Sequence, residues 1–249
     1  DVVMIGDSFG FSSCVNKPYD LKSQLERVSK KKILNLSVSG TGPIEQLKLI
    51  KDYINETNFN TFIWIFYEGN DDNDLKNKDI GSNTSLGGDK LLKSKKDIKV
   101  NYKNFEWQND KLVKIKIFLA EKLKGMNAFV KYFKTYPEVT NYKKYNEILN
   151  DMNKFLLKKN LKQKYIYYLP KYTRLAHKNK NHPEIIYLNK IRNYVQTAAK
   201  NNDFIFIDGS NFFHNRLDPL DIFHYRLPTH FNEKGYELTA NHINSLILK

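Results

Sequence analysis

Cysteine, long apolar runs and several familiar catalytic motifs are all scarce in this chain of 249 residues. Its single cysteine, Cys14, excludes an internal disulfide framework. No apolar run approaches the roughly 20 residues that a membrane-spanning helix needs, so no transmembrane segment is expected. The chain has no Gly-rich loop ending in Lys-Ser or Lys-Thr, which disfavours phosphoryl transfer, and no Gly-x-Ser-x-Gly elbow, which disfavours an α/β-hydrolase.

Acidic residues are also few relative to basic ones. The chain has 41 Lys and Arg against 27 Asp and Glu, a formal net charge of +14, which favours an anionic partner such as an acidic polysaccharide or a membrane surface. The basic residues are mostly Lys scattered among Asn, without the Arg-aromatic module that reads nucleic acid. Specific nucleic-acid binding is therefore not expected.

The chain begins with Asp1, and the first apolar run follows at once. We therefore expect the complete protein to carry something upstream, whether a signal peptide, a membrane anchor or another domain. The cell envelope or periplasm is favoured over the cytoplasm.

Apolar runs of strand length alternate with helical patterns along the chain. The runs are continuous, as in strands buried on both faces, and occupy residues 2–5, 33–36, 61–66, 165–169 and 204–207. Helical periodicity occupies residues 19–28, 44–54, 183–200 and 233–248. This alternation predicts one three-layer α/β/α domain, residues 1–249, with a five-stranded parallel sheet in the flavodoxin-like order 2-1-3-4-5.

The segment from about residue 72 to residue 142 breaks the alternation. It is crowded with Lys, Asn and aromatic residues, including Tyr102 and Trp107. A structureless loop of that length is unusual in a compact domain, so we predict a mainly helical insertion after strand three, with helices at about 111–123 and 128–133. The insertion is expected to cover the candidate site and set substrate choice; a solvated cap without substrate contact is the alternative.

Four polar positions follow the predicted strands or precede the last helix. Ser8 follows the first strand, Gly40 the second and Asn70 the third, while His230 lies just before the C-terminal helix. Because the carboxyl ends of parallel strands meet at one edge of the sheet, where open α/β sheets bind their ligands, the topology places all four at that edge. Taken singly, Gly40 and Asn70 are equally explained as turn formers and His230 as an incidental loop residue.

Together the four blocks resemble those of the SGNH (GDSL-type) hydrolases, a family named for one Ser, Gly, Asn and His from separate blocks. The blocks read Gly-Asp-Ser, Ser-Gly, Gly-Asn-Asp and His-Phe-Asn-Glu-Lys-Gly. The resemblance extends from Ile5 to the last helix and leaves the insertion unmatched. It implies a serine nucleophile at Ser8 and an oxyanion hole built from the amides of Ser8 and Gly40 and the side chain of Asn70.

The same resemblance implies that His230 is the general base, in preference to His214 and His224, because only His230 begins the final block. The family usually places an Asp three residues before this His, but position 227 is Leu. The nearest carboxylates before His230, Asp218 and Asp221, are the candidate acids.

Two alternatives to a carboxylate acid stand beside them. A main-chain carbonyl of residues 225–228 could accept the second imidazole N–H, which we favour because Pro228 stiffens the approach. Loss of catalysis is the other alternative, since the orienting acid of a triad stabilises the imidazolium.

The resemblance implies a serine-dependent ester hydrolase that removes an O-acetyl or other O-acyl group from a carbohydrate or another small ester. A glycan O-acetyltransferase using the same residues is one alternative, and a non-catalytic glycan-binding or interaction domain is another. This chemistry needs no cofactor and no metal. The acidic run at residues 71–74 lacks the alternating ligands and terminal Glu of a calcium loop, so no metal site is expected there.

Overall fold

The computed structural model describes residues 1–54, 58–75, 141–159, 161–177 and 179–248. All of them belong to one compact unit, Asp1–Ile80 with Glu138–Lys249. The predicted insertion at 72–142, with its helices and with Tyr102 and Trp107, lies outside the described residues except at its two ends.

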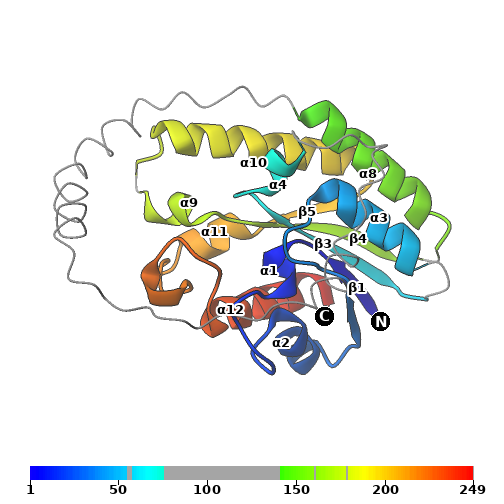
Figure 1. The fold of residues 1–249 in the computed structure, drawn as a ribbon, viewed down its shortest axis with the longest axis horizontal. Helices are drawn as coiled ribbons and strands as arrows, with labels where there is room; N and C mark the ends of the chain where they lie inside the picture. Colours follow the sequence, from blue (N-terminus) through cyan, green and yellow to red (C-terminus); the bar gives the residue numbers. More distant parts are fainter. Residues whose placement is uncertain (55–57, 76–140, 160, 178, 249) are drawn as a thin grey trace, which may run out of the picture. The chain divides into compact units, whose positions relative to one another are not determined.

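Five parallel strands form the sheet that carries the unit (Figure 1). In chain order they are β1 (Val2–Ile5), β2 (Ile33–Asn35), β3 (Thr61–Tyr67), β4 (Gln163–Leu169) and β5 (Ile205–Asp208). The spatial order β2-β1-β3-β4-β5 confirms the predicted flavodoxin-like topology. The register pairs Tyr67 with Leu169, so β3 and β4 end together, while β1 ends at Ile5, opposite Trp64 and three residues before the end of β3.

Helices cover both faces of the sheet, which confirms the predicted three layers (Figure 1). One face packs on α2 (Leu21–Ser29) and α12 (Glu233–Ile243), and the other on α3 (Pro43–Tyr53), α8 (Tyr142–Leu156) and α10 (Pro183–Asn201). Side chains alternate along a strand. Ile63 and Ile65 therefore join the core under α2 and α12, while Trp64 and Phe66 point the other way and pack on Tyr145 of α8.

The element boundaries differ from the predicted ones at a few places. Helix α8 was missed, although its buried residues Tyr145, Ile148, Leu149, Met152 and Leu156 repeat at helical spacing. The last helix is regular only as far as Ile243, and Asn244–Leu248 continues as a π-helix.

Short helices begin almost directly after four strands and gather at the carboxyl edge of the sheet. They are α1 (Ser8–Phe11), α4 (Asp71–Asp74), α9 (Tyr172–Ala176) and α11 (Gly209–His214). Each strand thus delivers polar residues to the edge where parallel sheets carry their sites.

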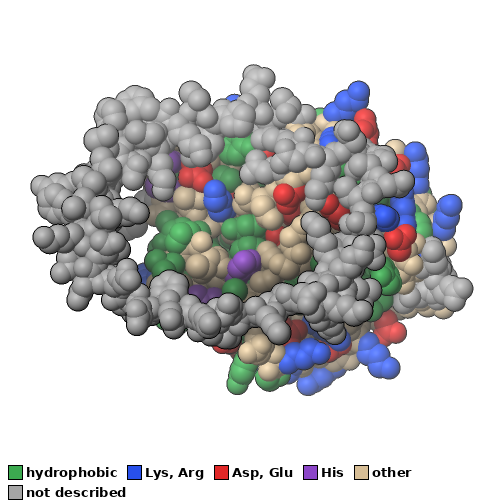
Figure 2. Space-filling model, in the orientation of Figure 1, with side chains coloured by type: hydrophobic (Ala, Val, Ile, Leu, Met, Phe, Trp, Pro, Cys, Tyr) green, Lys and Arg blue, Asp and Glu red, His purple; other side chains and the backbone are tan. Residues whose placement is uncertain are grey.

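The face of the described part that is seen in Figure 2 carries mixed charge. Figure 2 shows Lys and Arg side chains interspersed with Asp and Glu where the side chains are coloured, without a single basic stripe. None of the described helices combines the length and apolar character needed to cross a bilayer.

Candidate active site

Ser8 lies at the start of α1, in a tight turn directly after β1. The Asp7 side chain caps this helix, because its Oδ1 accepts a hydrogen bond from the Phe9 amide at 2.8 Å. Gly10 lets the turn pack closely on the loop after β2, since a Cβ there would lie 2.4 Å from Ser37 Oγ. The cap and the close packing fix Ser8 at the sheet edge with its side chain half-buried.

His230 faces Ser8 from the other end of the chain. A hydrogen bond of 2.9 Å joins His230 Nε2 to Ser8 Oγ. The two residues after the histidine hold it in place: Phe231 is buried and forms an isolated antiparallel bridge with Phe223, and Asn232 caps α12. The structure thus brings together the serine and histidine of the first and last sequence blocks.

The second imidazole nitrogen contacts neither of the candidate acids. Asp218 forms an ion pair with Arg226, and Asp221 is bound by Arg216 and Lys234, with Lys234 Nζ 2.6 Å from its Oδ2. Basic neighbours in the same loop region and in α12 therefore hold both carboxylates. Position 227 is Leu, where the family pattern has an Asp. Neither Asp218 nor Asp221 takes the place of that Asp beside His230.

Two of the four main-chain carbonyls proposed as the alternative partner accept other hydrogen bonds. The Arg226 carbonyl accepts a hydrogen bond from Tyr172 Oη at 3.0 Å, and the Leu227 carbonyl accepts one from the Thr229 amide at 2.7 Å. The partner of His230 Nδ1 is instead the thiol of Cys14, with 3.8 Å between nitrogen and sulfur. Cys14 lies in the turn after α1 with a left-handed φ of 74°.

Gly40 and Asn70 are tied to the Ser8 turn by their neighbours. The Asn70 side chain forms a hydrogen bond with the Asp7 carboxylate, and its Nδ2 lies 3.4 Å from Asp74 Oδ2. Gly40 has a φ of +79°, a conformation that favours glycine, and is exposed. Beside it, Ser39 Oγ accepts a hydrogen bond of 3.3 Å from Ser13 Oγ, in the turn after α1.

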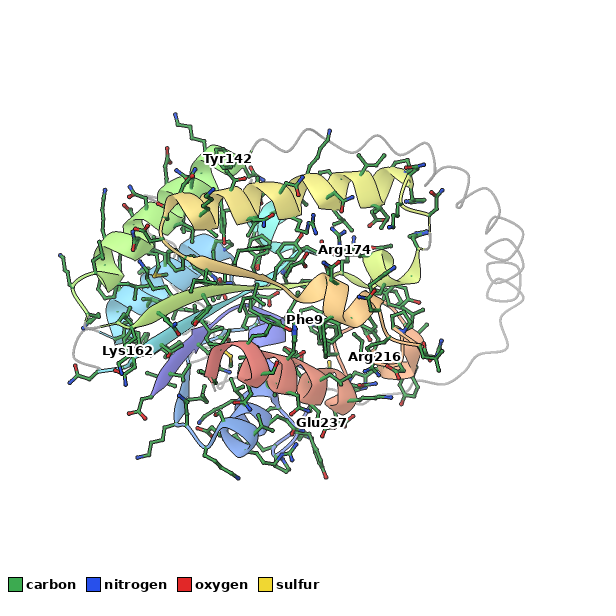
Figure 3. All side chains as sticks on the ribbon, turned by 180° about the vertical axis from the view of Figure 1, so that it is seen from behind. Phe9, Tyr142, Lys162, Arg174, Arg216 and Glu237 are labelled. Atoms are coloured by element: carbon green, nitrogen blue, oxygen red, sulfur yellow. The ribbon has the colours of Figure 1, made fainter. Side chains whose placement is uncertain are left out.

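Aromatic rings support the imidazole. Phe9, in the interior beneath the site (Figure 3), stacks on Tyr67 with centroids 3.8 Å apart and lies 5.0 Å from the His230 ring. Phe9, Tyr67 and Cys14 were not among the predicted site residues. Phe9 directly follows Ser8 and Tyr67 ends β3, so their positions carried a signal, whereas nothing in the sequence pairs Cys14 with His230.

Two buried carboxyl groups lie close to Ser8 and His230. Asp7 and Asp71 are both fully buried, and within the described ranges neither forms an ion pair with a basic side chain. Burial raises the pKa of Asp7, although hydrogen bonds from the Phe9 amide and Asn70 oppose the rise. Burial and the neighbouring Asp7 charge also raise the pKa of Asp71.

The pKa of His230 is shifted in the opposite direction, below its usual value. Burial lowers the pKa of His230, and the negative charge of Asp7 partly offsets this effect. The imidazole is therefore neutral near pH 7, which is the form that can accept a proton from Ser8.

A third buried carboxylate at the same edge is fully paired. Glu68 follows β3 and accepts hydrogen bonds from Arg174 Nε and Nη2, both at 2.7 Å, from Tyr168 Oη at 2.6 Å and from the Lys171 amide at 2.8 Å. Arg174, which is labelled in Figure 3, reaches Glu68 from α9. This cluster anchors α9 against β3 and β4.

Comparison with known proteins supports the fold. No family model and no curated protein sequence matches the chain. Among solved structures, an acetyl xylan esterase (AlAXEase) matches with a TM-score of 0.56 and 13% identity, covering 99% of this chain and 100% of that one. A member of the lipolytic G-D-S-L family from Veillonella parvula matches with a TM-score of 0.53 and 9% identity, covering 99% and 97%. The chain has the SGNH hydrolase fold.

A further match is an acetyl xylan esterase from Geobacillus stearothermophilus, with a TM-score of 0.52 and 14% identity over 100% of this chain and 94% of that one. Within the SGNH fold, this chain has its first block after β1, its second after β2, its third after β3 and its last before α12. Its departure from the sequence pattern lies at Leu227, and the structure puts Cys14 beside the imidazole nitrogen that would otherwise meet an acid.

Proposed function

We propose that this SGNH-fold protein is a serine-dependent ester hydrolase with Ser8 as nucleophile and His230 as general base. The observation that supports the proposal is the 2.9 Å hydrogen bond between His230 Nε2 and Ser8 Oγ. This separation lies within the range over which a base can take a proton from its nucleophile. The lowered pKa of His230 supplies the neutral imidazole that the first step requires.

The chemistry proceeds through an acyl-enzyme. Ser8 Oγ attacks the ester carbonyl carbon while its proton passes to His230 Nε2. The tetrahedral intermediate collapses, the bond to the alcohol oxygen breaks, and the imidazolium returns the proton to the leaving alkoxide. Water, deprotonated by His230, then attacks the acyl-serine, and breakage of the bond to Ser8 Oγ releases the carboxylic acid and restores the hydroxyl.

The negative oxygen of the intermediate needs donors. We assign them to the amides of Ser8 and Gly40 and to the Asn70 side chain, in line with the sequence blocks. The left-handed Gly40 and the link between its turn and the Ser8 turn support this assignment. Asn70 also donates to Asp7, so it holds the carboxylate that adjoins the nucleophile.

The imidazolium needs a negative charge nearby. Asp221 and Asp218 are engaged by basic side chains, whereas Asp7 is buried without a cationic partner among the described residues and raises the pKa of His230 through its charge. Asp7 therefore takes over the electrostatic part of the missing acid, without the direct hydrogen bond to the imidazole.

We propose an O-acetyl or other O-acyl carbohydrate as the substrate. Structural likeness to two acetyl xylan esterases supports this substrate class. The net charge of +14 favours an acidic polysaccharide within it, because the positive surface field attracts anions.

Substitution of the two central residues tests the function. Ser8→Ala and His230→Ala should each lower hydrolysis of p-nitrophenyl acetate by at least about 10,000-fold, because nucleophile and base act as a unit. The matched control is His214→Ala, which removes an exposed histidine at the end of α11 and should leave activity unchanged.

Labelling identifies the nucleophile independently of the substrate. A serine-directed phosphonate should modify Ser8, as located by mass spectrometry, and should fail to modify the His230→Ala protein at a comparable rate. Labelling of another serine would overturn the assignment. Absence of both labelling and ester hydrolysis in the folded wild-type protein would favour a binding domain, and acyl transfer to a glycan faster than to water would favour a transferase.

A further inference from the structure

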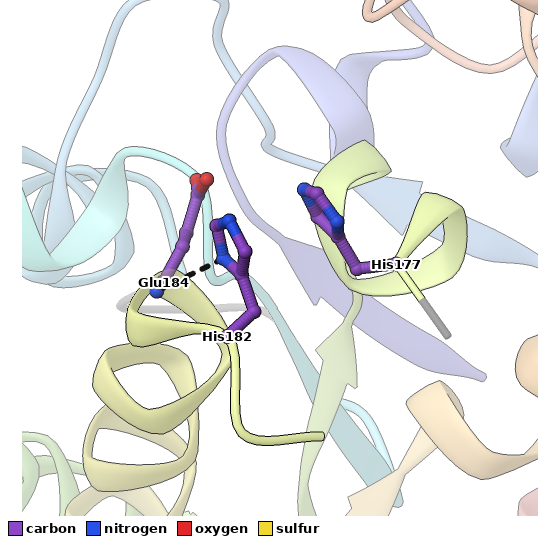
Figure 4. A group of neighbouring side chains, drawn as sticks. All are labelled: His177, His182 and Glu184. Carbon is purple, nitrogen blue, oxygen red and sulfur yellow. Dashed lines mark hydrogen bonds between the residues drawn. The ribbon is translucent and has the colours of Figure 1, made fainter. Parts of the chain in front are cut away.

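Two histidines and a glutamate converge where α9 ends and α10 begins, outside the Ser8–His230 site. His177 is the C-cap residue of α9, His182 is the N-cap residue of α10, and Glu184 lies in the first turn of α10. Their candidate ligand atoms all lie within 4.8 Å of one another. The two imidazoles stack with centroids 4.1 Å apart and an interplanar angle of 17° (Figure 4).

We propose that His177, His182 and Glu184 bind a divalent transition-metal ion of the zinc type. Two imidazoles and one carboxylate form a donor set that zinc uses in proteins. Imidazole ligands also select such ions over magnesium and calcium, which prefer oxygen. This site is independent of the proposed esterase chemistry, which uses none of the three residues.

The local structure positions the donors. Pro183 at the first position of α10 fixes the direction in which the chain enters the helix, with His182 just before it. Glu184 Oε1 accepts a hydrogen bond from Thr173 Oγ1 at 3.0 Å, so a residue of α9 orients the carboxylate. Such outer-shell hydrogen bonds are usual around metal ligands.

Zinc–ligand bonds of about 2.0–2.2 Å require the three donors to draw closer together. These side chains are only half-buried, so this movement does not disturb the core.

Two contacts must change when the metal binds. His182 Nδ1 accepts a hydrogen bond of 3.3 Å from the Glu184 amide, and coordination through either ring nitrogen removes that acceptor. The Lys171 ammonium shares the Glu184 carboxylate with the metal and repels it. Its side chain is 37% exposed, so it can turn into solvent. The bound ion would then crosslink the end of α9 to the start of α10.

Calorimetry with zinc tests the proposal. The chelator-treated and dialysed protein should bind one Zn²⁺ ion, and His177→Ala and His182→Ala should each weaken binding by about 100-fold or more, at least as much as the loss of an outer-shell partner. His214→Ala is the matched control and should bind like the wild type, as should Ser8→Ala. Equal binding by the wild type and both ligand variants, or no binding by the wild type, would overturn the site.

A charge variant tests the site without removing a ligand. Lys171→Met should tighten zinc binding by about tenfold, because it removes a competing positive charge at the carboxylate. In the zinc-loaded wild type, X-ray absorption should show two imidazoles at about 2.0–2.1 Å. Weaker binding by Lys171→Met, or a shell without imidazole, would contradict the proposal.

Discussion

Glu68 and Asp7 are both buried carboxylates at the same edge of the sheet, yet their surroundings differ in kind. Glu68 is 2% exposed and receives a bidentate Arg174, a tyrosine hydroxyl and a backbone amide. Asp7 is fully buried and receives only neutral donors among the described residues. The first arrangement neutralises its charge and fastens a helix, whereas the second leaves a charge available to the imidazole of His230.

The difference shows how one sheet edge can separate anchoring from chemistry. A buried ion pair adds little net stability, but removing one partner is strongly destabilising because it leaves the other charge buried and uncompensated. An unpaired buried carboxylate costs stability, and it is retained where its field acts on a reacting group. We therefore expect variants of the two sites to affect stability and activity in opposite proportions.

The largest effect should come from breaking the Glu68–Arg174 pair. Arg174→Met leaves the Glu68 carboxylate buried without its cation, and should lower the free energy of unfolding by about 3–5 kcal/mol. Urea unfolding followed by circular dichroism measures this loss. Activity per folded molecule should change little, and adding Glu68→Gln should recover part of the stability. A loss below about 1 kcal/mol would mean that the pair is not an anchor.

The next effect should come from neutralising Asp7. Asp7→Asn keeps a side-chain oxygen that can cap α1 but removes the charge that stabilises the imidazolium, so kcat should fall by about tenfold, equivalent to about one pKa unit. Because Asp7 raises the pKa of His230, its loss should move the acidic limb of the profile of kcat/KM against pH to lower pH. A profile of unchanged position would remove Asp7 from the mechanism.

Stability should separate this electrostatic role from damage to the fold. Because the pKa of Asp7 is raised in the folded protein, Asp7 contributes fully to the free energy of unfolding at pH values below its pKa in the unfolded chain. This contribution is lost as the pH rises through its pKa in the folded protein. The melting temperature of Asp7→Asn should therefore exceed that of the wild type at neutral pH, by a margin that shrinks on acidification. Asp71→Asn is the matched control, with the same pH trend in stability and nearly unchanged activity.

The smallest effect should come from Cys14. A thiol is a weak hydrogen-bond donor and acceptor, and its sulfur lies 3.8 Å from His230 Nδ1. We expect Cys14→Ala to change kcat/KM by less than about threefold, since a neutral pair contributes far less than a carboxylate would. A loss of tenfold or more in steady-state assays would assign the thiol the orienting role that position 227 lacks.

The fold could be predicted because its determinants are local. Continuous apolar runs mark buried parallel strands, and all five runs lie within one or two residues of the observed strands. The polar residues after β1 and β3 could be placed at the same edge for the same reason. Helix α8 was missed although it begins where the predicted insertion ends, because its pattern adjoins that polar, aromatic-rich segment.

The surroundings of His230 could not be predicted, because they depend on loops brought together by the whole fold. Asp218 and Asp221 are the nearest carboxylates before His230 in sequence, but Arg226, Arg216 and Lys234 compete for them. Cys14 and Asp7 reach the imidazole from the opposite end of the chain, so no spacing in the sequence signals the contact. Which charged residues of a loop pair with one another depends on the path that the loop takes in three dimensions.

The hydrogen bond between Ser8 and His230 joins residues 222 positions apart, and this separation bears on how the protein folds. Ser8 begins α1, directly after the first strand, while the histidine is held by the cap of α12, which packs on α2. Contacts between residues so distant in the chain form only after much of the intervening chain is ordered, so we expect this hydrogen bond to form late in folding. During synthesis Ser8 emerges long before His230, and we expect the nascent chain to lack the Ser8–His230 pair until the last helix docks.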